Sequence, residues 1–246
     1  MSDPPPPSGT SWIGDYHRRT SHRFEAYAKG PEALDWDAQP APFRHFAQAP
    51  VTALPRLGQD VGDSVLAKAL SRPFGSAAMN NAVPADLAAL GALLQLSLGI
   101  TAWKSLGPDR WAVRANPSSG NLHPLEAYVV VIGWPGLADG VHHYRPEHHA
   151  LELRARFGPG KHGPRRLMIG LTSVMWREAW KYGERAFRYC QLDAGHGIAA
   201  IAYAASVLGW SLREEAHVGH ATLARLLGTD RIGDFPARRK PAGGEA

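Results

Sequence analysis

The chain has 246 residues, 44% of them hydrophobic and 20% charged, a composition typical of a water-soluble globular protein with one main domain. Its formal charge of +5 suits phosphate-bearing ligands. Because there is no zinc-finger spacing and no basic motif interleaved with aromatic residues, we expect no nucleic acid partner. The single cysteine, Cys190, excludes an intrachain disulfide, and the longest apolar run is too short to span a bilayer, so we expect a cytoplasmic protein without a membrane partner.

The N-terminal part of the chain is rich in proline. Residues 1–11 combine proline, serine and glycine, which is typical of a disordered segment. Prolines recur in residues 12–60, which argues against long helices there. We therefore expect residues 1–60 to form an extended arm that wraps over a neighbouring surface. The main domain is expected over residues 61–235, followed by a flexible tail over residues 236–246.

The middle of the chain predicts one helix followed by short strands. The helix is expected to begin near Pro84–Asp86 and to end near Gly99, because leucines recur between them at three- and four-residue steps. Strands are expected at residues 127–133, 141–144, 150–154 and 167–172, with the second and third as a hairpin. These elements predict an α+β protein in which helices flank a small, mostly antiparallel sheet.

From Trp176 onward the pattern is helical again. The stretch Leu192–Leu208 consists almost entirely of apolar and tiny residues, so we expect a helix that is buried on all sides, in the centre of the domain or at a dimer interface. His196 is expected to be buried and bonded to Asp193 or to backbone. A last helix is expected over residues 221–227, ending at Gly228.

A polar loop between two prolines, over residues 117–124, leads into the first strand. Gly120 has no Cβ atom, so a flat ligand can approach its backbone closely. Ser118, Ser119 and Asn121 offer hydrogen-bond donors and acceptors to the edge of a heterocycle such as the flavin ring. The alternative is an ordinary turn before a strand, for which the same residue types are typical.

A cluster of cations follows in the stretch 176–189. In one continuous helix these side chains would form a single stripe: Arg177, Lys181, Arg185 and Arg188. Such a stripe favours a bound anion, for which a flavin phosphate is one candidate. The alternative is a solvated charged face whose cations pair with Glu178 and Glu184.

Gly183 predicts a break or kink in the same stretch, because glycine weakens a helix interior. A break would place Lys181 and Tyr182 at a helix end that faces a cleft. There the pair could serve proton transfer, since burial or a neighbouring cation shifts the pKa of either group. The alternative is a surface lysine beside a packed tyrosine.

The histidines do not predict a metal site. His142–His143 and His148–His149 are adjacent pairs, and neighbours on a strand point to opposite faces. We expect no metal ion at His217 and His220 either. The sequence also lacks the glycine-rich and serine motifs of Rossmann, P-loop and α/β-hydrolase proteins.

Two motifs together resemble the nitroreductase superfamily. Pro117-Ser-Ser-Gly-Asn-Leu-His-Pro124 before a strand resembles its flavin loop. Lys181-Tyr-Gly-Glu-Arg-Ala-Phe-Arg-Tyr189, followed by Asp193-Ala-Gly-His196, resembles the SagB-type branch, which contains dehydrogenases that oxidise thiazolines and oxazolines in peptide biosynthesis. Asp15-Tyr-His-Arg-Arg-Thr20 resembles the opening of proteins with two such domains in tandem, of which this chain would be one half.

The resemblance implies an FMN-dependent oxidoreductase with a nitroreductase-like α+β fold, forming a homodimer and transferring hydride between substrate and flavin N5. The implied substrate is a peptide or small molecule, either dehydrogenated or reduced with NAD(P)H. Lys181 and Tyr182 match the pair considered catalytic in azoline dehydrogenases, and Asn121 matches the residue at the pyrimidine edge of the flavin. The cofactor-binding residues expected in all are Arg114, Pro117, Ser118, Ser119, Gly120, Asn121, Arg185 and Arg188.

One departure from the family pattern favours a different class of function. The superfamily's Arg-Arg-Ser-x-Arg phosphate motif is replaced here by Ser71-Arg-Pro-Phe74. Phosphate binding would then depend on Arg185 and Arg188, or on a partner subunit. The alternative function is a degenerate flavin-fold domain without turnover that acts as a scaffold or partner subunit.

Overall fold

The computed structural model describes residues 9–58, 65–73, 82–158, 160 and 163–235. The chain divides into two compact units. Unit 1 consists of Met1–Pro42, Asn116–Leu125 and Thr172–Ala199, and unit 2 of Phe43–Ala115, Glu126–Leu171 and Ala200–Ala246. The division into an arm, a main domain and a tail stays a prediction, and residues 1–8, 59–60 and 236–246 lie outside the described residues.

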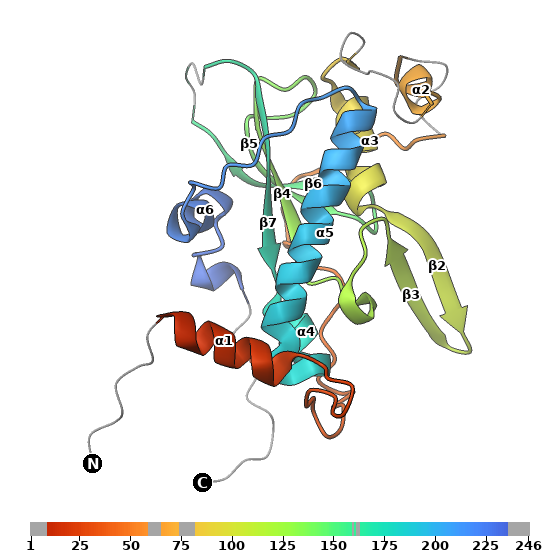
Figure 1. The fold of residues 1–246 in the computed structure, drawn as a ribbon. Helices are drawn as coiled ribbons and strands as arrows, with labels where there is room; N and C mark the ends of the chain where they lie inside the picture. The colour runs from red at the N-terminus through yellow and green to blue at the C-terminus, as the bar shows by residue number, and fades with distance from the viewer. Residues whose placement is uncertain (1–8, 59–64, 74–81, 159, 161–162, 236–246) are drawn as a thin grey trace. The chain divides into compact units, whose positions relative to one another are not determined.

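A five-stranded sheet with the order β1-β6-β5-β4-β7 forms the centre of unit 2 (Figure 1). Its strands are β1 (Val51–Ala53), β4 (Leu125–Ile132), β5 (Gly140–Arg145), β6 (Ala150–Arg156) and β7 (Arg166–Ser173). The pairs β1–β6, β5–β6 and β4–β5 are antiparallel, with Tyr144 opposite Leu151 and Val129 opposite His142. The four expected strands and the expected hairpin are confirmed.

The helices of unit 2 begin and end where local signals place them. They are α2 (Val65–Leu70), α3 (Leu87–Leu98), α6 (His220–Leu227) and the short 3-10 helix η3 (Ile232–Asp234). Asp86 caps α3, its side chain accepting a hydrogen bond from the Ala89 N–H at 2.8 Å, and Gly99 ends the helix as predicted. Gly228 ends α6 with a φ of 71°, the left-handed conformation that glycine adopts without strain.

A separate two-stranded sheet was not expected from the sequence. It consists of β2 (Ile100–Leu106) and β3 (Asp109–Arg114), paired antiparallel with Lys104 opposite Trp111. Most of its side chains are exposed on both faces. The sequence therefore lacks the alternation of apolar and polar residues by which half-buried strands are recognised.

β4 is buried on both faces, which explains its unbroken run of apolar residues. Val129 and Val131 join a core that includes α3 and the part of α5 (Ala186–Val207) that belongs to unit 2. Tyr128 and Val130 point the other way, into a second core that contains the end of α6. Each fully buried side chain of this size stabilises the fold by about 1.5–3 kcal/mol, so β4 anchors both cores.

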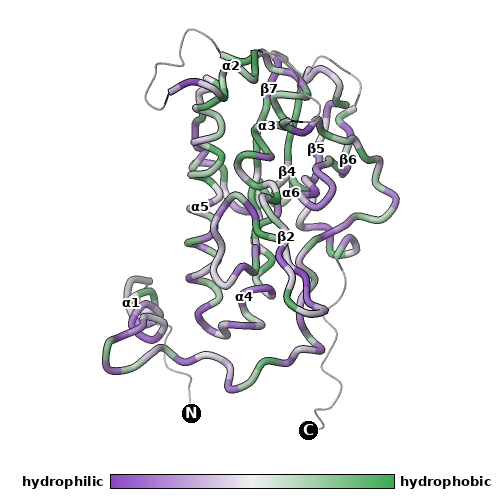
Figure 2. The backbone as a smooth tube through the Cα atoms, turned by 90° about the vertical axis from the view of Figure 1, so that its right-hand side faces the viewer, coloured by the Kyte–Doolittle hydropathy of each residue, from purple (hydrophilic) through white to green (hydrophobic). Residues whose placement is uncertain are grey.

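Unit 1 contains α1 (Gly9–Thr20), the 3-10 helix η1 (Ser119–Asn121), α4 (Met175–Tyr182), η2 (Gly183–Arg185) and the start of α5. The segment after α1 is mostly hydrophilic (Figure 2) and packs on α4. Trp180 Nε1 donates to the Asp35 carbonyl at 2.6 Å, and the Trp36 ring meets the Trp180 ring edge-on. This part of the N-terminal segment therefore wraps over neighbouring surface.

The helix α1 corrects the expectation that residues 12–60 contain no long helix. The prolines that argued against helices begin at Pro31, so nothing in Gly9–Thr20 interrupts the backbone. Long-range contacts then secure α1 in unit 1. The Tyr16 hydroxyl donates to the Glu184 carbonyl at 2.9 Å, and Arg19 Nε donates to the Glu184 carboxylate at 3.1 Å.

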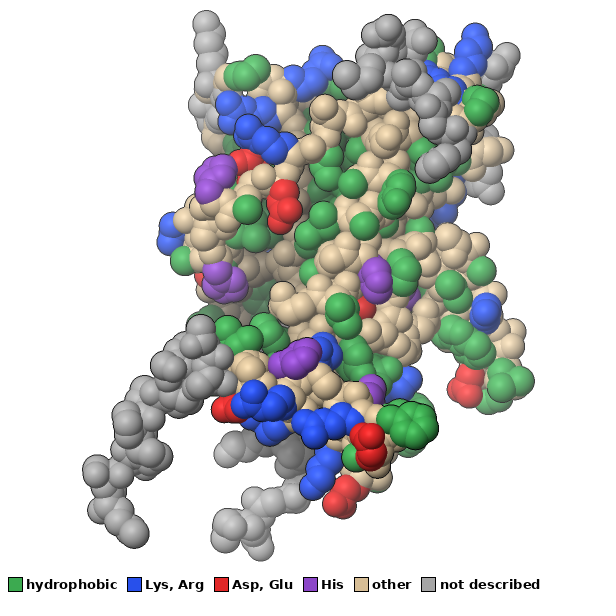
Figure 3. All heavy atoms as spheres, in the orientation of Figure 1, with side chains coloured by type: hydrophobic (Ala, Val, Ile, Leu, Met, Phe, Trp, Pro, Cys, Tyr) green, Lys and Arg blue, Asp and Glu red, His purple; other side chains and the backbone are tan. Residues whose placement is uncertain are grey.

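The helix α5 is not buried on all sides within the chain, so of the two expected places the centre of the domain does not apply to all of it, and the dimer interface stays a prediction. Leu192 is 53% exposed and Tyr203 is 71% exposed, with Ile198 and Val207 also exposed. Hydrophobic side chains show along this helix in Figure 3. His196, which was expected to be buried, is exposed within the chain. The apolar pattern predicts burial but does not say whether the same chain or another one supplies the cover.

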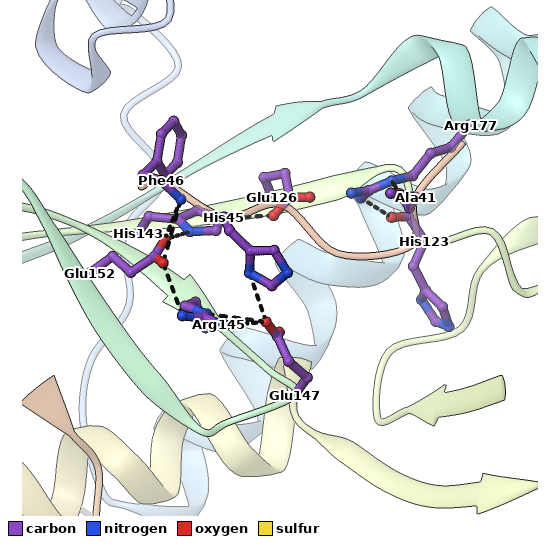
Figure 4. A network of polar contacts seen from close by, with 10 residues as sticks. All are labelled: Ala41, His45, Phe46, His123, Glu126, His143, Arg145, Glu147, Glu152 and Arg177. Carbon is purple, nitrogen blue, oxygen red and sulfur yellow. Dashed lines mark hydrogen bonds and ion pairs between the residues drawn. The ribbon is translucent and has the colours of Figure 1, made fainter. Parts of the chain in front are cut away.

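A buried ionic network joins β4, β5 and β6 in unit 2 (Figure 4). His143 is 1% exposed, with Nε2 2.8 Å from Glu126 Oε2 and Nδ1 3.0 Å from Glu152 Oε2. Burial lowers the pKa of His143, but its bonds to the two carboxylates outweigh burial and hold the pKa above its usual value. Burial raises the pKa of Glu152, but His143, the Phe46 N–H and Arg145 outweigh burial and hold it below its usual value.

The neighbouring histidine points to the opposite face of β5, as expected for a strand. His142 Nε2 lies 2.9 Å from the Ala138 carbonyl oxygen, away from the carboxylates around His143. In the described part of the chain, no group of three or more His, Cys, Asp or Glu residues could hold a metal ion. The histidines of the sheet therefore serve hydrogen bonding within unit 2.

Candidate active site

The loop over residues 117–121 forms a left-handed turn in unit 1. Gly120 and Asn121 have φ angles of 61° and 60° within η1. Glycine adopts this conformation freely, whereas for asparagine it is less common, so the surrounding structure has to hold the loop. Both residues are exposed, so a ligand can reach the backbone between them.

The loop is held by Asp193, a fully buried residue of α5. Its Oδ2 accepts a hydrogen bond from Ser118 Oγ at 2.6 Å, and its Oδ1 accepts from the backbone N–H and the hydroxyl of Ser119, each at 3.1 Å. Ser118 Oγ in turn accepts from the His123 N–H at 2.8 Å. The hydroxyls predicted to line the flavin ring are therefore bonded inside the protein.

Lys181 and Tyr182, at the end of α4, lie directly over Gly120. A Cβ atom at Gly120 would overlap Tyr182 Oη and would lie 3.1 Å from Lys181 Nζ. The helix α4 ends here because Gly183 has a φ of 55° and a ψ of −125°, which no helix can continue. The structure thus confirms the predicted break and brings the two motifs together within unit 1.

A second carboxyl group, that of Glu178 on α4, is buried near Asp193. The residue is 0% exposed, and neither of its carboxyl oxygens has a hydrogen-bond partner among the described residues. Burial, and then the charge of Asp193, raises the pKa of Glu178 to about 8, although Lys181 partly opposes this. Two neighbouring buried carboxyl groups thus differ. Asp193 accepts hydrogen bonds from the loop, whereas Glu178 accepts none from any described residue and, with its raised pKa, holds a proton at neutral pH.

The same environment acts on two more groups. Burial, and then the Glu178 carboxyl, raises the pKa of Tyr182, so the phenol keeps its proton at neutral pH. Burial together with Glu178 and Asp193 raises the pKa of the Cys190 thiol to about 12. Cys190 is therefore unsuited to act as a nucleophile.

The four cations of residues 177–188 do not form the single stripe that one continuous helix would give. Because α4 ends at Tyr182, the two arginines of η2 and α5 do not continue its spacing. Arg177 is buried, and its guanidinium donates to the Ala41 carbonyl at 3.0 Å and to the His123 carbonyl at 2.8 Å (Figure 4). Arg177 therefore holds two backbone segments of unit 1 together.

The two arginines expected at a phosphate contact the segment around α1. Arg185 Nη1 lies 2.8 Å from His22 Nε2. Arg188 donates to Thr20 Oγ1 at 2.8 Å and to the His17 carbonyl at 3.1 Å. Figure 3 shows basic side chains gathered in the part of the molecule that carries α1. Donors that could bind a phosphate are thus engaged within unit 1.

The remaining predicted residues have varied surroundings. Arg114 is a buried residue of β3 in unit 2, with its guanidinium 5.3 Å from the centre of the Phe43 ring. Pro117 is exposed at the start of the loop, and Asn121 Oδ1 lies 3.0 Å from His123 Nε2. The replacement for the phosphate motif is described only in part, because Phe74 lies outside the described residues.

Sequence reasoning missed the structural roles of Asp193 and Glu178. Asp193 was expected to bond His196, and Glu178 to offset a surface cation. A signal for the first was present, since an acid inside the apolar stretch 192–208 requires several donors if it is buried. The loop hydroxyls were the donors, but only the fold identifies them.

The fold and this site define a nitroreductase-like α+β protein. The chain is 27% identical over 137 residues to a protein of Methanocaldococcus jannaschii named as a nitroreductase, a match that covers 51% of the chain and 66% of that protein. It is 30% identical over 133 residues to the trifolitoxin-processing protein TfxB of Rhizobium leguminosarum bv. trifolii, covering 48% of the chain and 36% of TfxB. No family model matches the chain.

A solved structure supports the same conclusion. A protein of Anabaena variabilis named as a nitroreductase superposes with a TM-score of 0.58 at 29% identity, over 79% of this chain. The chain spans only 38% of that protein and 36% of TfxB. These likenesses confirm the predicted resemblance to SagB-type nitroreductase relatives and the nitroreductase-like fold.

Proposed function

We propose that the chain is an FMN-dependent oxidoreductase of the SagB-like type. The observation that carries the proposal is the placement of Lys181 and Tyr182 directly over Gly120 of an exposed loop. A cation and a phenol beside exposed left-handed backbone suit the polar edge of a redox-active heterocycle. The likeness to proteins named as nitroreductases supports the same assignment.

The residues of this site suit the flavin ring better than the flavin phosphate. The exposed Gly120–Asn121 backbone allows close approach of a planar ring. The two serines would act indirectly, because their hydroxyls bond to Asp193. Arg185 and Arg188 would bind the phosphate only after exchanging their contacts with the segment around α1.

In this proposal each side chain over the loop has a distinct task. Bound FMN would supply the group that accepts or donates hydride. Tyr182 Oη, whose pKa is raised by burial, would donate a hydrogen bond and hold or deliver a proton at the reacting atom. Lys181 Nζ would stabilise negative charge that develops beside the loop.

The proposed substrate is a peptide or another small molecule. TfxB is a trifolitoxin-processing protein, and this likeness favours the peptide. NAD(P)H is the proposed electron donor if the reaction runs as a reduction. We also propose a cytoplasmic homodimer, because exposed apolar side chains on α5, among them Leu192 and Tyr203, suit cover by a second chain. Within the described residues, no helix has the length and apolar character needed to cross a membrane.

The second candidate function is a scaffold or partner subunit with a degenerate flavin fold. One specific observation favours it, namely that Arg185 and Arg188 both bond to the segment around α1. A chain that uses its phosphate donors for its own structure would bind FMN weakly or not at all.

A titration of the purified chain with FMN separates the two functions. If the chain is the proposed enzyme, the purified protein should retain FMN and absorb at about 450 nm, as flavoproteins do. Failure of the wild type to bind added FMN would support the scaffold. Asn121→Ala should weaken FMN binding, because Asn121 lies in the loop that is proposed to hold the flavin ring. An unchanged affinity for FMN would mean that the loop is an ordinary turn.

The role of Lys181 is tested by the rate at which NAD(P)H reduces bound FMN. Lys181→Ala should leave FMN bound and lower this rate by roughly 10²-fold, the usual contribution of one positioned polar group. Lys29→Ala, at an exposed lysine of unit 1, is the matched control and should react at the wild-type rate. A wild-type rate in Lys181→Ala would remove this residue from the mechanism.

A further inference from the structure

The loop after Pro117 carries more left-handed backbone than its sequence favours. Gly120, Asn121 and His123 have φ angles of 61°, 60° and 48°. Only the first is glycine, so the other two occupy a sparsely populated conformation that their surroundings must stabilise. The contacts of the loop within unit 1 therefore determine its shape.

Asp193 makes the contacts that can do this. Its carboxylate is 0% exposed and accepts hydrogen bonds from Ser118 Oγ at 2.6 Å, from the Ser119 N–H at 3.1 Å and from Ser119 Oγ at 3.1 Å. Hydrogen bonds to an ionised group are roughly twice as strong as bonds between neutral groups. The Ser118 hydroxyl also links Asp193 to His123, because its oxygen accepts a hydrogen bond from the His123 N–H at 2.8 Å.

We propose that Asp193 is the positioning residue of this site. Acting through the two serines that follow Pro117, its carboxylate fixes the loop in the shape that presents Gly120 to the end of α4. Asp193 itself is buried beneath the loop and does not have to touch a ligand. The inference depends on the proposed function in one respect, namely that the groups positioned by Asp193 would bind a flavin.

The arrangement requires a carboxylate at this position. Asp193 only accepts hydrogen bonds from the loop, whereas an asparagine has one acceptor oxygen and an NH2 group that donates. Asp193→Asn would turn that NH2 group toward a serine donor and leave a loop hydroxyl or N–H without its acceptor. Because the substitution preserves volume, its effect reports the lost acceptor and not a cavity.

A second buried carboxyl supplies a matched control. Glu178 is also 0% exposed, yet its carboxyl oxygens make no hydrogen bond to any described residue. Glu178→Gln therefore makes the same chemical change near the site without removing a contact to the loop. Comparing the two variants separates the general effect of replacing a buried carboxyl group by an amide from the loss of the loop contacts.

The experiment measures amide hydrogen exchange of the full chain without added flavin. The reporters are the N–H groups of Ser119 and His123, which depend on Asp193 directly and through Ser118. Asp193→Asn should speed the exchange of both by roughly tenfold or more. Glu178→Gln should leave both rates unchanged or slower. If circular dichroism shows that Asp193→Asn does not fold, Ser118→Ala decides the question by the exchange rate of the Ser119 amide, which should also rise.

FMN titrations of the same proteins then separate this inference from the proposed function. If the wild type binds FMN, Asp193→Asn should weaken binding by roughly tenfold and alter the visible spectrum of the bound flavin. If the wild type rejects FMN while the variant exchanges faster, the positioning role stands and the proposed function fails. Wild-type exchange in a folded Asp193→Asn overturns the inference. Faster exchange with unchanged FMN affinity and spectrum overturns it too, because Asp193 would then be only structural.

Discussion

The carboxyl group of Glu178 is buried in the interior of unit 1, and it has no hydrogen-bond partner among the described residues. Its pKa is about 8 in the folded chain, raised from an ordinary value of 4.5. Between these two values the folded state holds the proton more tightly than the unfolded state, so stability falls as pH rises from 4.5 to 8. Glu178→Gln removes this penalty, and we expect the variant to be more stable than the wild type at neutral pH.

The size of the gain follows from the same pKa. At pH 7 the penalty covers the interval from 4.5 to 7, which corresponds to an upper limit of roughly 3 kcal/mol. Water entry and local relaxation reduce such penalties in real proteins, so we expect a gain of about 1–2 kcal/mol. Below pH 4.5 the carboxyl is protonated in both states, and the gain should vanish.

Urea unfolding of the two proteins, followed by tryptophan fluorescence at several pH values, measures this difference. The difference between variant and wild type cancels the other titrating groups, which are common to both. Glu32→Gln, the same change at an exposed glutamate of unit 1, should leave stability unchanged at every pH. A gain for Glu178→Gln that is equal at pH 4 and pH 8, or absent at both, would refute the reasoning.

Other substitutions test other parts of the molecule. Gly120→Ala should lower the free energy of unfolding in urea by about 1–2 kcal/mol, because the new Cβ would overlap the end of α4 and the residue would keep a φ of 61°. Gly195→Ala, where the Cβ would meet open space, should leave the free energy of unfolding unchanged. The stability that His143 contributes should be present below pH 6.5 and should be lost as the pH rises through the raised pKa of His143. The stability that Glu152 contributes should be present above pH 4.5 and should be lost as the pH falls through the lowered pKa of Glu152. Unfolding curves of His143→Gln that keep both pH dependences of the wild type would contradict this account. Tyr203→Arg should abolish the proposed dimer in light scattering while leaving the monomer folded, since Tyr203 is 71% exposed; a dimer that persists would place the contact elsewhere.

Several elements could be predicted from neighbouring residues alone. Asp86 and Gly99 mark the ends of α3, and Gly183 ends α4, because capping and backbone freedom act within one helical turn. The apolar run of β4 predicted a strand, and its burial on both faces explains why the run shows no alternation. The pairing of the loop motif with Lys181 and Tyr182 followed from resemblance, and the geometry over Gly120 agrees with it.

The sequence by itself thus determined the local elements and the two motifs, since dihedral preferences and side-chain spacing are properties of adjacent residues. Only the tertiary structure decided which partners the buried polar groups have. In the folded chain Asp193 accepts hydrogen bonds from the loop serines, whereas Glu178 makes no hydrogen bond to any described residue. Arg188 donates to a residue of α1, and Tyr203 is exposed. The physical reason is that a buried charge or an apolar helix face is satisfied by segments far away in the chain, and short-range patterns do not specify which ones.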